Sequence, residues 1–164
     1  MVSGMKLGVS DSFRGRADTA AYWEAWAAAV LSRAGMFTMH WPFTIDGEDH
    51  GKTWDLGVGA NDPKDGWTTW KKVEVKSVNQ VFSNSSDYPY DTIMVCSQNS
   101  YLRKWPGSST TGRDFLFVSR ITGNIIWLPS DSPVTVGHET FDSTRGESYR
   151  TVHAKKSDLR ELCD

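Results

Sequence analysis

The run from residue 70 to residue 78 constrains the fold most, because charged and apolar side chains alternate along it. In an extended chain one face then carries charges and the other small or apolar groups: Lys72, Glu74 and Lys76 against Val73, Val75 and Ser77. This period of two predicts a β-strand. Residues 92–97 (TIMVCS) are apolar without alternation and are interpreted as a central strand covered on both faces. Beside such a neighbour, residues 70–78 would lie inside the sheet, where a charge is costly unless it is paired or bound to a metal.

An amphipathic helix precedes these strands. Asp18 or Thr19 can cap its first turn, and Gly35 stands where a helix commonly ends. Its apolar side chains recur at helical spacing: Trp23, Trp26, Ala27, Val30, Leu31 and Ala34. Residues 1–17 are polar and contain glycine, so they are predicted to form a flexible N-terminal arm ahead of a single domain over residues 18–164.

The rest of the chain predicts a mixed fold. Strands are expected at residues 37–43, 53–58, 114–121, 125–128 and 149–154, and short helices at residues 97–105 and 157–162. Gly123 supplies the positive φ of a tight turn between the strands on either side of it. Elements in this order indicate an α/β (α+β) domain with a central mixed β-sheet flanked by helices.

Composition excludes several classes of protein. No apolar stretch approaches the roughly 18 residues of a membrane span, and the N-terminus lacks a signal-peptide core, so membrane and secreted proteins are disfavoured. The 18 Lys and Arg against 20 Asp and Glu give a net charge of −2, which excludes a purely electrostatic, histone-like nucleic-acid binder. Cys96 and Cys163 form no CxxC motif and are interpreted as free thiols in a reducing cytoplasm.

Two carboxylates and a lysine are candidates for chemistry. Asp55 lies on the polar face of the strand predicted before the Glu74 strand. If the two strands pair, Asp55 and Glu74 converge with Lys76 beside them. The carboxylates and the Val75 carbonyl are hard oxygen ligands of the kind that suits Mg²⁺ or Mn²⁺. Lys76 could then orient or deprotonate a metal-bound water.

This arrangement resembles the PD-(D/E)XK nuclease superfamily. In that family a helix bearing a glutamate precedes a sheet, one strand carries the aspartate, and the next carries Glu-x-Lys. The matching residues here, within about residues 18–97, are Glu24, Asp55 and Glu74-Val75-Lys76. Two features depart from the family pattern: Asp55 follows Trp54 instead of proline, and the stretch between Asp55 and Glu74 is on the long side.

The resemblance implies a restriction-endonuclease-like core and a Mg²⁺- or Mn²⁺-dependent deoxyribonuclease, most similar to small phage-type or Holliday-junction-resolving members. Asp55, Glu74 and the Val75 carbonyl would bind the metal, and Lys76 would position the attacking water. Glu24 would hold a metal-bound water or a second ion. The products would carry 5′-phosphate and 3′-hydroxyl ends. The expected location is the cytoplasm, that of the host if a phage encodes the protein, and a branched DNA substrate would call for a homodimer.

DNA, the expected partner, would be held by a local patch, because the net charge is negative. The candidate contacts are basic and aromatic residues near the carboxylates: Arg14, Arg16, Lys64, Trp67, Lys71 and Lys72. The residues leave open whether the DNA is duplex, single-stranded or branched, and whether it is cut internally or from an end.

Structural interpretations of the same residues also stay open. Glu74 and Lys76 could form an ion pair on a solvated strand face. Asp55 could accept hydrogen bonds from backbone amides beside a turn, and Glu24 could lie on the solvated flank of its helix. The rival functional class is a non-catalytic nucleic-acid- or protein-binding domain that keeps the nuclease fold, which divalent-metal binding would distinguish from an enzyme.

Overall fold

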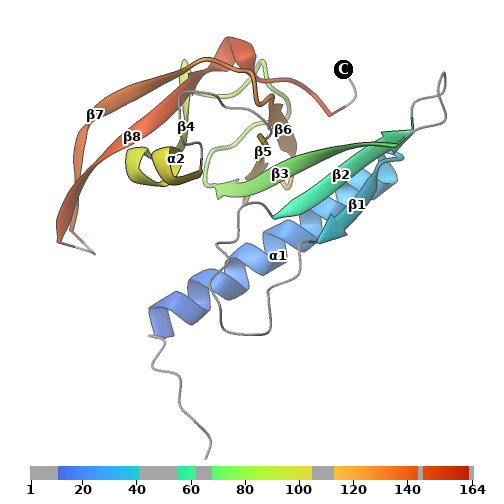
Figure 1. Ribbon diagram of the computed structural model, residues 1–164, viewed down its shortest axis with the longest axis horizontal. Coiled ribbons are helices and arrows are strands. Elements are labelled where there is room, and N and C mark those ends of the chain that lie inside the picture. The colour runs from blue at the N-terminus through green and yellow to red at the C-terminus, as the bar shows by residue number, and fades with distance from the viewer. Residues whose placement is uncertain (1–10, 41–54, 62–67, 105–112, 144–145, 163–164) are drawn as a thin grey trace, which may run out of the picture.

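The computed structural model describes residues 11–40, 55–61, 68–104, 113–143 and 146–162 (Figure 1). In chain order its elements are α1 (Asp11–Arg33), β1 (Phe37–His40), β2 (Leu56–Asn61), β3 (Thr68–Val78), β4 (Thr92–Ser97), α2 (Gln98–Lys104), β5 (Arg113–Ser119), β6 (Ile125–Leu128), β7 (Val134–Asp142), β8 (Glu147–Lys155) and the 3₁₀ turn η1 (Lys156–Asp158).

The strands form two sheets. A five-stranded mixed sheet has the order β1-β2-β3-β5-β6, in which β3 and β5 run parallel and the other neighbours antiparallel. Strands β4, β8 and β7 form a second sheet, which is antiparallel. The chain between the parallel strands β3 and β5 supplies β4 and α2 as their crossover. The mixed α/β class and the mixed sheet are confirmed, whereas the second sheet was not predicted.

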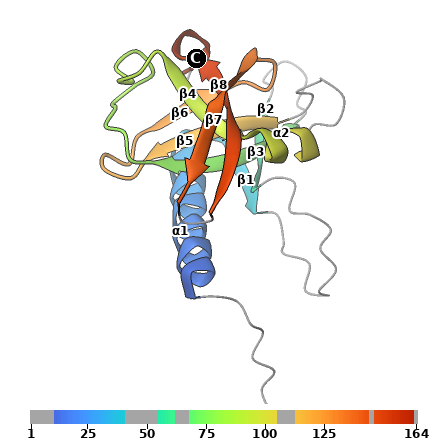
Figure 2. The same ribbon diagram turned by 90° about the vertical axis from the view of Figure 1, so that its left-hand side faces the viewer.

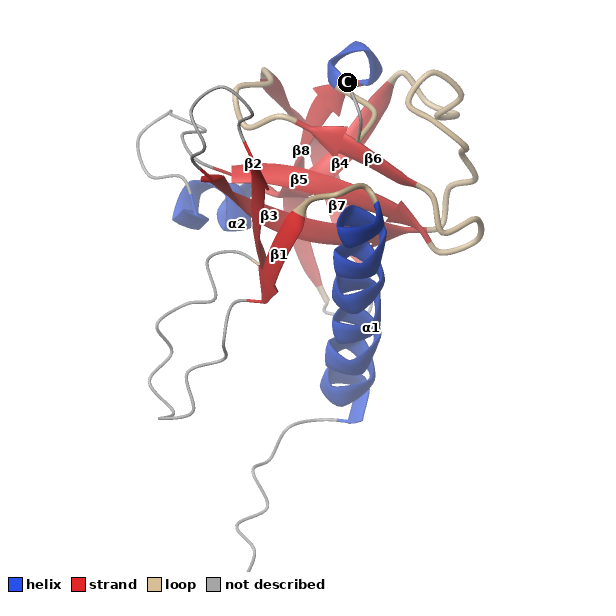
Figure 3. Cartoon of the chain, turned by 90° about the vertical axis from the view of Figure 1, so that its right-hand side faces the viewer, coloured by secondary structure: helices blue, strands red, loops and turns tan. Residues whose placement is uncertain are grey.

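Three layers pack on one another. The helix α1 covers one face of the five-stranded sheet, and the second sheet lies against the other (Figures 2 and 3). Because successive residues of a strand face opposite sides, β5 contributes to both cores. Its Leu116 packs with Leu31 of α1 and Val73 of β3, whereas its Phe117 packs with Ile93 of β4. The two cores hold β3 and β5 at the centre of the domain.

Residues 92–97 form an edge strand, so the prediction of a central strand covered on both faces was wrong. As β4 they lie at one edge of the second sheet, and Met94 is 52% exposed. The strand covered on both faces is β5, whose residues 114–119 are all buried. A short apolar run does not by itself specify which sheet it joins or how many of its faces are covered.

The helix α1 is longer than predicted. It begins at Asp11, so residues 11–17 of the predicted arm are helical. Ala27 and Leu31 of the apolar stripe are fully buried, whereas Trp26 is 39% exposed and donates its indole N–H to the Gly123 carbonyl at 2.9 Å. Gly123 has a φ of +75° in the tight turn between β5 and β6, which confirms the predicted hairpin.

The C-terminal part differs from prediction in two places. Strand β7 was not predicted, because most of its side chains are exposed and a bulge between Val136 and Glu139 breaks the period of two. The helix predicted at residues 157–162 is reduced to η1. Beyond it, Trp127 and Arg160 exchange two backbone hydrogen bonds of 2.8 and 2.7 Å, which keep the chain extended.

Candidate active site

Asp55 lies immediately before β2 and is anchored to β3. In the antiparallel register Leu56 is opposite Val73, so Asp55 comes next to Glu74. The Asp55 N–H donates to the Val73 carbonyl at 2.9 Å, and the Val75 N–H donates to Asp55 Oδ2 at 2.8 Å. The bond to a backbone amide, which the sequence left open, is therefore present. It fixes the Asp55 carboxylate against the strand that carries Glu74.

Glu74 and Lys76 form an ion pair inside the fold. Lys76 Nζ lies 2.6 Å from Glu74 Oε1, and the Glu74 side chain is only 5% exposed. The interpretation as a pair on a solvated strand face is thereby wrong. In the parallel register Glu74 and Lys76 are next to Phe115 and Phe117, which belong to the core shared with the second sheet. This apolar surrounding strengthens the attraction between the two charges.

The pKa of Lys76 is raised above its ordinary value. Burial is the largest single influence and would lower this pKa. The Coulombic attraction to Glu74 and the hydrogen bond with it, with smaller contributions from Cys96 and Asp55, together outweigh burial. Lys76 is therefore a cation at neutral pH. In this state its ammonium can hold an anionic oxygen or orient a water, but it cannot accept a proton.

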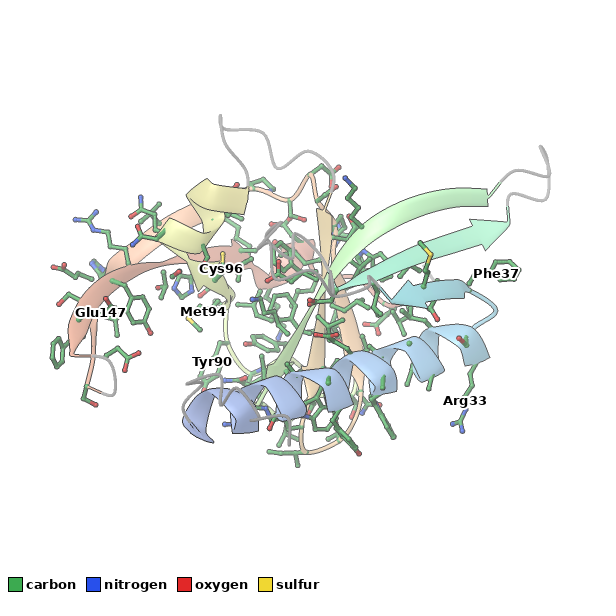
Figure 4. All side chains as sticks on the ribbon, turned by 60° about the horizontal axis from the view of Figure 1, so that its bottom comes forward. Arg33, Phe37, Tyr90, Met94, Cys96 and Glu147 are labelled. Carbon is green, nitrogen blue, oxygen red and sulfur yellow. The ribbon has the colours of Figure 1, made fainter. Side chains whose placement is uncertain are left out.

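A cleft of about 480 Å³ adjoins Lys76. Strand β4 and the start of α2 form one wall, and the far end of the β7–β8 hairpin forms the other. Figure 4 shows Met94 and Cys96 near α2, with Glu147 far out along β8. The other lining residues are mostly polar: Ser97, Asn99, Ser100, Asp142, Ser148 and Tyr149. Cys96 is a buried free cysteine, as predicted, and Cys163 lies outside the described residues.

Glu24 lies in a different layer from the cleft. It is a half-buried residue of α1, which packs on the opposite face of the five-stranded sheet from Lys76. Among the residues that the structure describes, no three His, Cys, Asp or Glu side chains form a group that could hold a metal ion. The structure thus brings Asp55 and Glu74 together without Glu24. The role of Glu24 toward a metal-bound water or a second ion stays a prediction.

The two lysines expected to bind DNA point to opposite faces of β3. Lys72 is exposed on the face of Glu74. Lys71 lies on the α1 face, where its Nζ is 3.3 Å from Asp114 Oδ2 and 5.8 Å from the centroid of the Trp127 ring. Asp114 is buried and also accepts the indole N–H of Trp127 at 2.8 Å. Lys71 therefore belongs to a structural network, and the expected single patch of Lys71 and Lys72 is not formed.

Four candidates for DNA contact remain. Arg14 and Arg16 belong to the N-terminal half of α1. Lys64 and Trp67 lie outside the described residues. The DNA contacts of all four stay predictions.

Sequence reasoning missed the outer wall of the cleft. Asp142, Glu147, Ser148 and Tyr149 come from the strand that was not predicted and from the first residues of β8. The only local signal was the predicted strand at 149–154, whose two-residue extension would have included Glu147. Nothing in the sequence indicated that this segment turns toward Lys76.

Comparisons with protein-family models, curated proteins and solved structures return no match for this chain. Within the described ranges, no helix has the length and apolar character needed to cross a membrane.

Proposed function

We propose that this protein is a Mg²⁺- or Mn²⁺-dependent deoxyribonuclease of the PD-(D/E)XK type. One observation carries the proposal: Asp55 is hydrogen-bonded to β3 next to Glu74, and Glu74 forms an ion pair with Lys76. The Val75 N–H holds the Asp55 carboxylate at 2.8 Å, and the Lys76 ammonium lies 2.6 Å from Glu74. The elements that bear them, a helix followed by an aspartate and then a Glu-x-Lys strand, stand in the order that the family resemblance implies.

The donor set fits a hard divalent cation. Asp55 and Glu74 supply carboxylate oxygens, and the main chain of Val75 lies beside them. Proteins commonly hold Mg²⁺ through one or two carboxylates, while waters and substrate phosphates complete its shell. Two protein carboxylates are therefore sufficient. When bound, the ion would lower the pKa of a coordinated water and stabilise the charge that develops on the phosphate.

The side chains have distinct tasks in this proposal. Asp55 and Glu74 hold the cation, and Lys76 positions the attacking water or a phosphate oxygen with its ammonium. Phe115 and Phe117 exclude bulk water from the inner side of the site. Hydrolysis adds water across the P–O3′ bond. The water oxygen stays on phosphorus as the 5′-phosphate, and a proton goes to the 3′ oxygen.

A non-catalytic binding domain is the second candidate. It is favoured by the same ion pair, because the Lys76 ammonium by itself supplies a positive charge to the Glu74 carboxylate. The two candidates differ in metal affinity. A binding domain would show no Mn²⁺ site at these carboxylates, whereas the nuclease would be stabilised thermally by millimolar Mn²⁺ that binds the native state.

Cleavage of plasmid and single-stranded DNA, with either Mg²⁺ or EDTA present, tests the proposal. We expect cleavage only with the metal, and a loss of roughly 10²-fold or more in Asp55→Asn and in Glu74→Gln. Asp87→Asn, which changes a carboxylate in the loop before β4, is the matched control and should cut normally. Wild-type cleavage rates in Asp55→Asn, or no cleavage together with no calorimetric Mn²⁺ binding, would remove the nuclease proposal.

A further inference from the structure

A second hollow lies at the opposite end of β4 from the cleft beside Lys76. Its volume is about 670 Å³, and it opens where β4 begins and β8 ends. The loop before β4 forms one wall, and the end of β8 together with η1 forms the other. Most of the lining side chains are hydroxyls and lysines: Ser85, Ser86, Thr92, Lys155, Lys156 and Ser157. The hollow is therefore lined mainly by groups that can donate hydrogen bonds.

Two hydrogen bonds from backbone amides hold the walls of this hollow together. The Lys156 N–H donates to the Asp91 carbonyl at 2.8 Å, which joins η1 to the start of β4. The Ser85 N–H donates to Glu161 Oε1 at 2.5 Å, which joins the loop to the C-terminal segment. The walls are thus fixed before a ligand arrives, so binding requires little ordering of the chain.

The lysines of the hollow are available to an anion. Among the described residues, no carboxylate forms an ion pair with Lys155 or Lys156. Asp91 is the carboxylate that lines the hollow, so two positive charges face one negative charge there. The attraction of an incoming anion to the two ammonium groups can therefore outweigh its repulsion from Asp91.

The donors match the chemistry of a phosphate group. A lysine ammonium carries three N–H donors, which suit the acceptor oxygens of a phosphate. The hydroxyls of Ser85, Thr92 and Ser157 can donate as well. Ser86 differs, because its hydroxyl already donates to Asn84 Oδ1 at 2.5 Å. Lysine, serine and threonine side chains are among the usual contacts of DNA phosphates, and such contacts position a strand regardless of its sequence.

The exposed face of β4 connects the hollow with the cleft. Thr92, which lines the hollow, and Met94, which lines the cleft, are both exposed on this face. Cys96 follows and lines the cleft beside Lys76, and Figure 4 shows Met94 between Tyr90 and Cys96 along this course. The four residues from Thr92 to Cys96 cover about 13 Å of strand. A B-form DNA strand advances about 3.4 Å per nucleotide, so about four nucleotides span the same distance.

We propose that the hollow holds a backbone phosphate of the DNA strand, about four nucleotides from the phosphate beside Lys76. This proposal rests on the proposed nuclease function and adds a second contact to its substrate site. The ammonium groups of Lys155 and Lys156 pair with the phosphate, and the hydroxyls of Thr92 and Ser157 donate to its oxygens. The strand between the two phosphates follows β4. Because the contact is to the backbone, it makes binding depend on the length of the strand and not on its sequence.

Fluorescence anisotropy of labelled oligo-dT tests the proposal, with EDTA present so that the strand stays intact. For a strand of about 12 nucleotides, Lys155→Gln combined with Lys156→Gln should lower the log–log slope of affinity against salt by about 0.7, the value for one neutralised phosphate of a single strand. Arg33→Gln, which removes an exposed cation at the end of α1, is the matched control and should keep the wild-type slope. The double lysine variant should unfold at the wild-type Tm, because the two lysines have no ion pair to lose.

A change of opposite sign and a change of strand length extend the test. Asp91→Asn removes the negative charge of the hollow and keeps the carbonyl that accepts the Lys156 N–H. It should raise oligo-dT affinity at low salt by about 2- to 5-fold, the size of one charge–charge interaction at close range in water. In wild type the affinity should rise once the strand exceeds about four nucleotides, and the double lysine variant should lose this rise.

Inorganic phosphate, measured by calorimetry, should bind much more weakly than oligo-dT, because it lacks the contacts along β4 and at the cleft. Five results would each overturn the proposal: no binding of oligo-dT by wild type, an unchanged salt slope in the double lysine variant, weaker binding by Asp91→Asn, an equal rise with strand length in wild type and the double lysine variant, or inorganic phosphate that binds as tightly as oligo-dT.

The failure of this proposal can be told apart from failure of the proposed function. If wild type cuts plasmid with Mg²⁺ but the double lysine variant keeps the wild-type salt slope, the nuclease proposal stands and the phosphate contact in the hollow is wrong. If the slope falls in the double lysine variant but wild type cuts no DNA with any divalent metal, the nuclease proposal is wrong, and with it the assignment of the strand to a scissile phosphate.

Discussion

Replacing Lys76 by methionine should destabilise the fold as well as abolish cleavage. Methionine keeps most of the apolar stem but removes the ammonium 2.6 Å from Glu74 Oε1, which leaves a carboxylate whose side chain is 5% exposed. Removing one partner of a fully buried pair costs about 3–5 kcal/mol. Because the Lys76 side chain is 33% exposed, water can reach the site. We therefore expect a loss of about 2–3 kcal/mol, below the fully buried case and above that of a surface pair.

Urea denaturation at pH 7 measures this loss as a lower midpoint at an unchanged slope. Adding Glu74→Gln to Lys76→Met removes the uncompensated charge, so the double variant should regain most of the lost stability without regaining cleavage. The raised pKa of Lys76 sets the pH range over which the ion pair stabilises the fold. In wild type the contribution of the pair is fully present below the unfolded-state value near 10.5, and it is lost as the pH rises through the higher folded-state pKa.

Two results would refute this reasoning. One is a Lys76→Met variant that unfolds at the wild-type urea concentration. The other is a double variant no more stable than Lys76→Met, which would mean that the carboxylate of Glu74 is not the source of the loss.

Three further predictions concern the surface, a loop and a turn. Lys72→Ala should flatten the salt dependence of DNA affinity by about one unit of log–log slope, because Lys72 shares the face of the site, whereas Lys71→Ala should not. Fluorescence anisotropy at several salt concentrations compares the two variants with wild type. A Lys72→Ala slope equal to that of wild type would place the DNA elsewhere. Asp87→Asn should lower the Tm at neutral pH, because backbone N–H groups of its loop lower the pKa of the Asp87 carboxyl below 3.8. That difference should vanish as the pH falls through the folded-state pKa, and a difference independent of pH would contradict it. Gly123→Ala should cost about 1–2 kcal/mol in thermal denaturation, because its φ is +75° and a Cβ would lie 2.8 Å from the Trp26 ring; an unchanged Tm would count against it.

The local features of the site could be predicted from the sequence. The alternation at residues 70–78 places Glu74 and Lys76 on one face, and a strand just before them along the chain is the natural antiparallel neighbour that brings in Asp55. The same alternation already places Lys71 and Lys72 on opposite faces of the strand, so the prediction that both lysines belong to one patch disagreed with it. What the sequence did not predict is that Lys76 contributes to stability. From the sequence its partner was expected to be the attacking water, or Glu74 on a solvated strand face, whereas the fold pairs it with Glu74 in an apolar surrounding.

The features that depend on distant contacts could not be predicted. Residues 92–97 and 114–119 are both apolar runs, and only the parallel pairing of β5 with β3 determines which of them is central. The cleft wall around Tyr149 is formed by exposed strands whose sequence lacks a buried face, and such strands leave little periodic signal. The sequence thus specified the strand that carries Glu74 and Lys76, but not the surface opposite them.

The outer part of the β7–β8 hairpin has a consequence for how this surface can change. Residues 139–142 and 147–150 pair only with each other among the described strands, whereas residues 152–154 of β8 pair on both sides. A ribbon of two strands is marginally stable alone, so its amide protons should exchange with solvent far sooner than those of Val152 and Ala154. The wall that carries Tyr149 and the strand that carries Glu74 then belong to different cooperative units. Substitutions can accumulate in the ribbon, changing the lining of the cleft, at little cost to the stability of the sheet that holds the carboxylates.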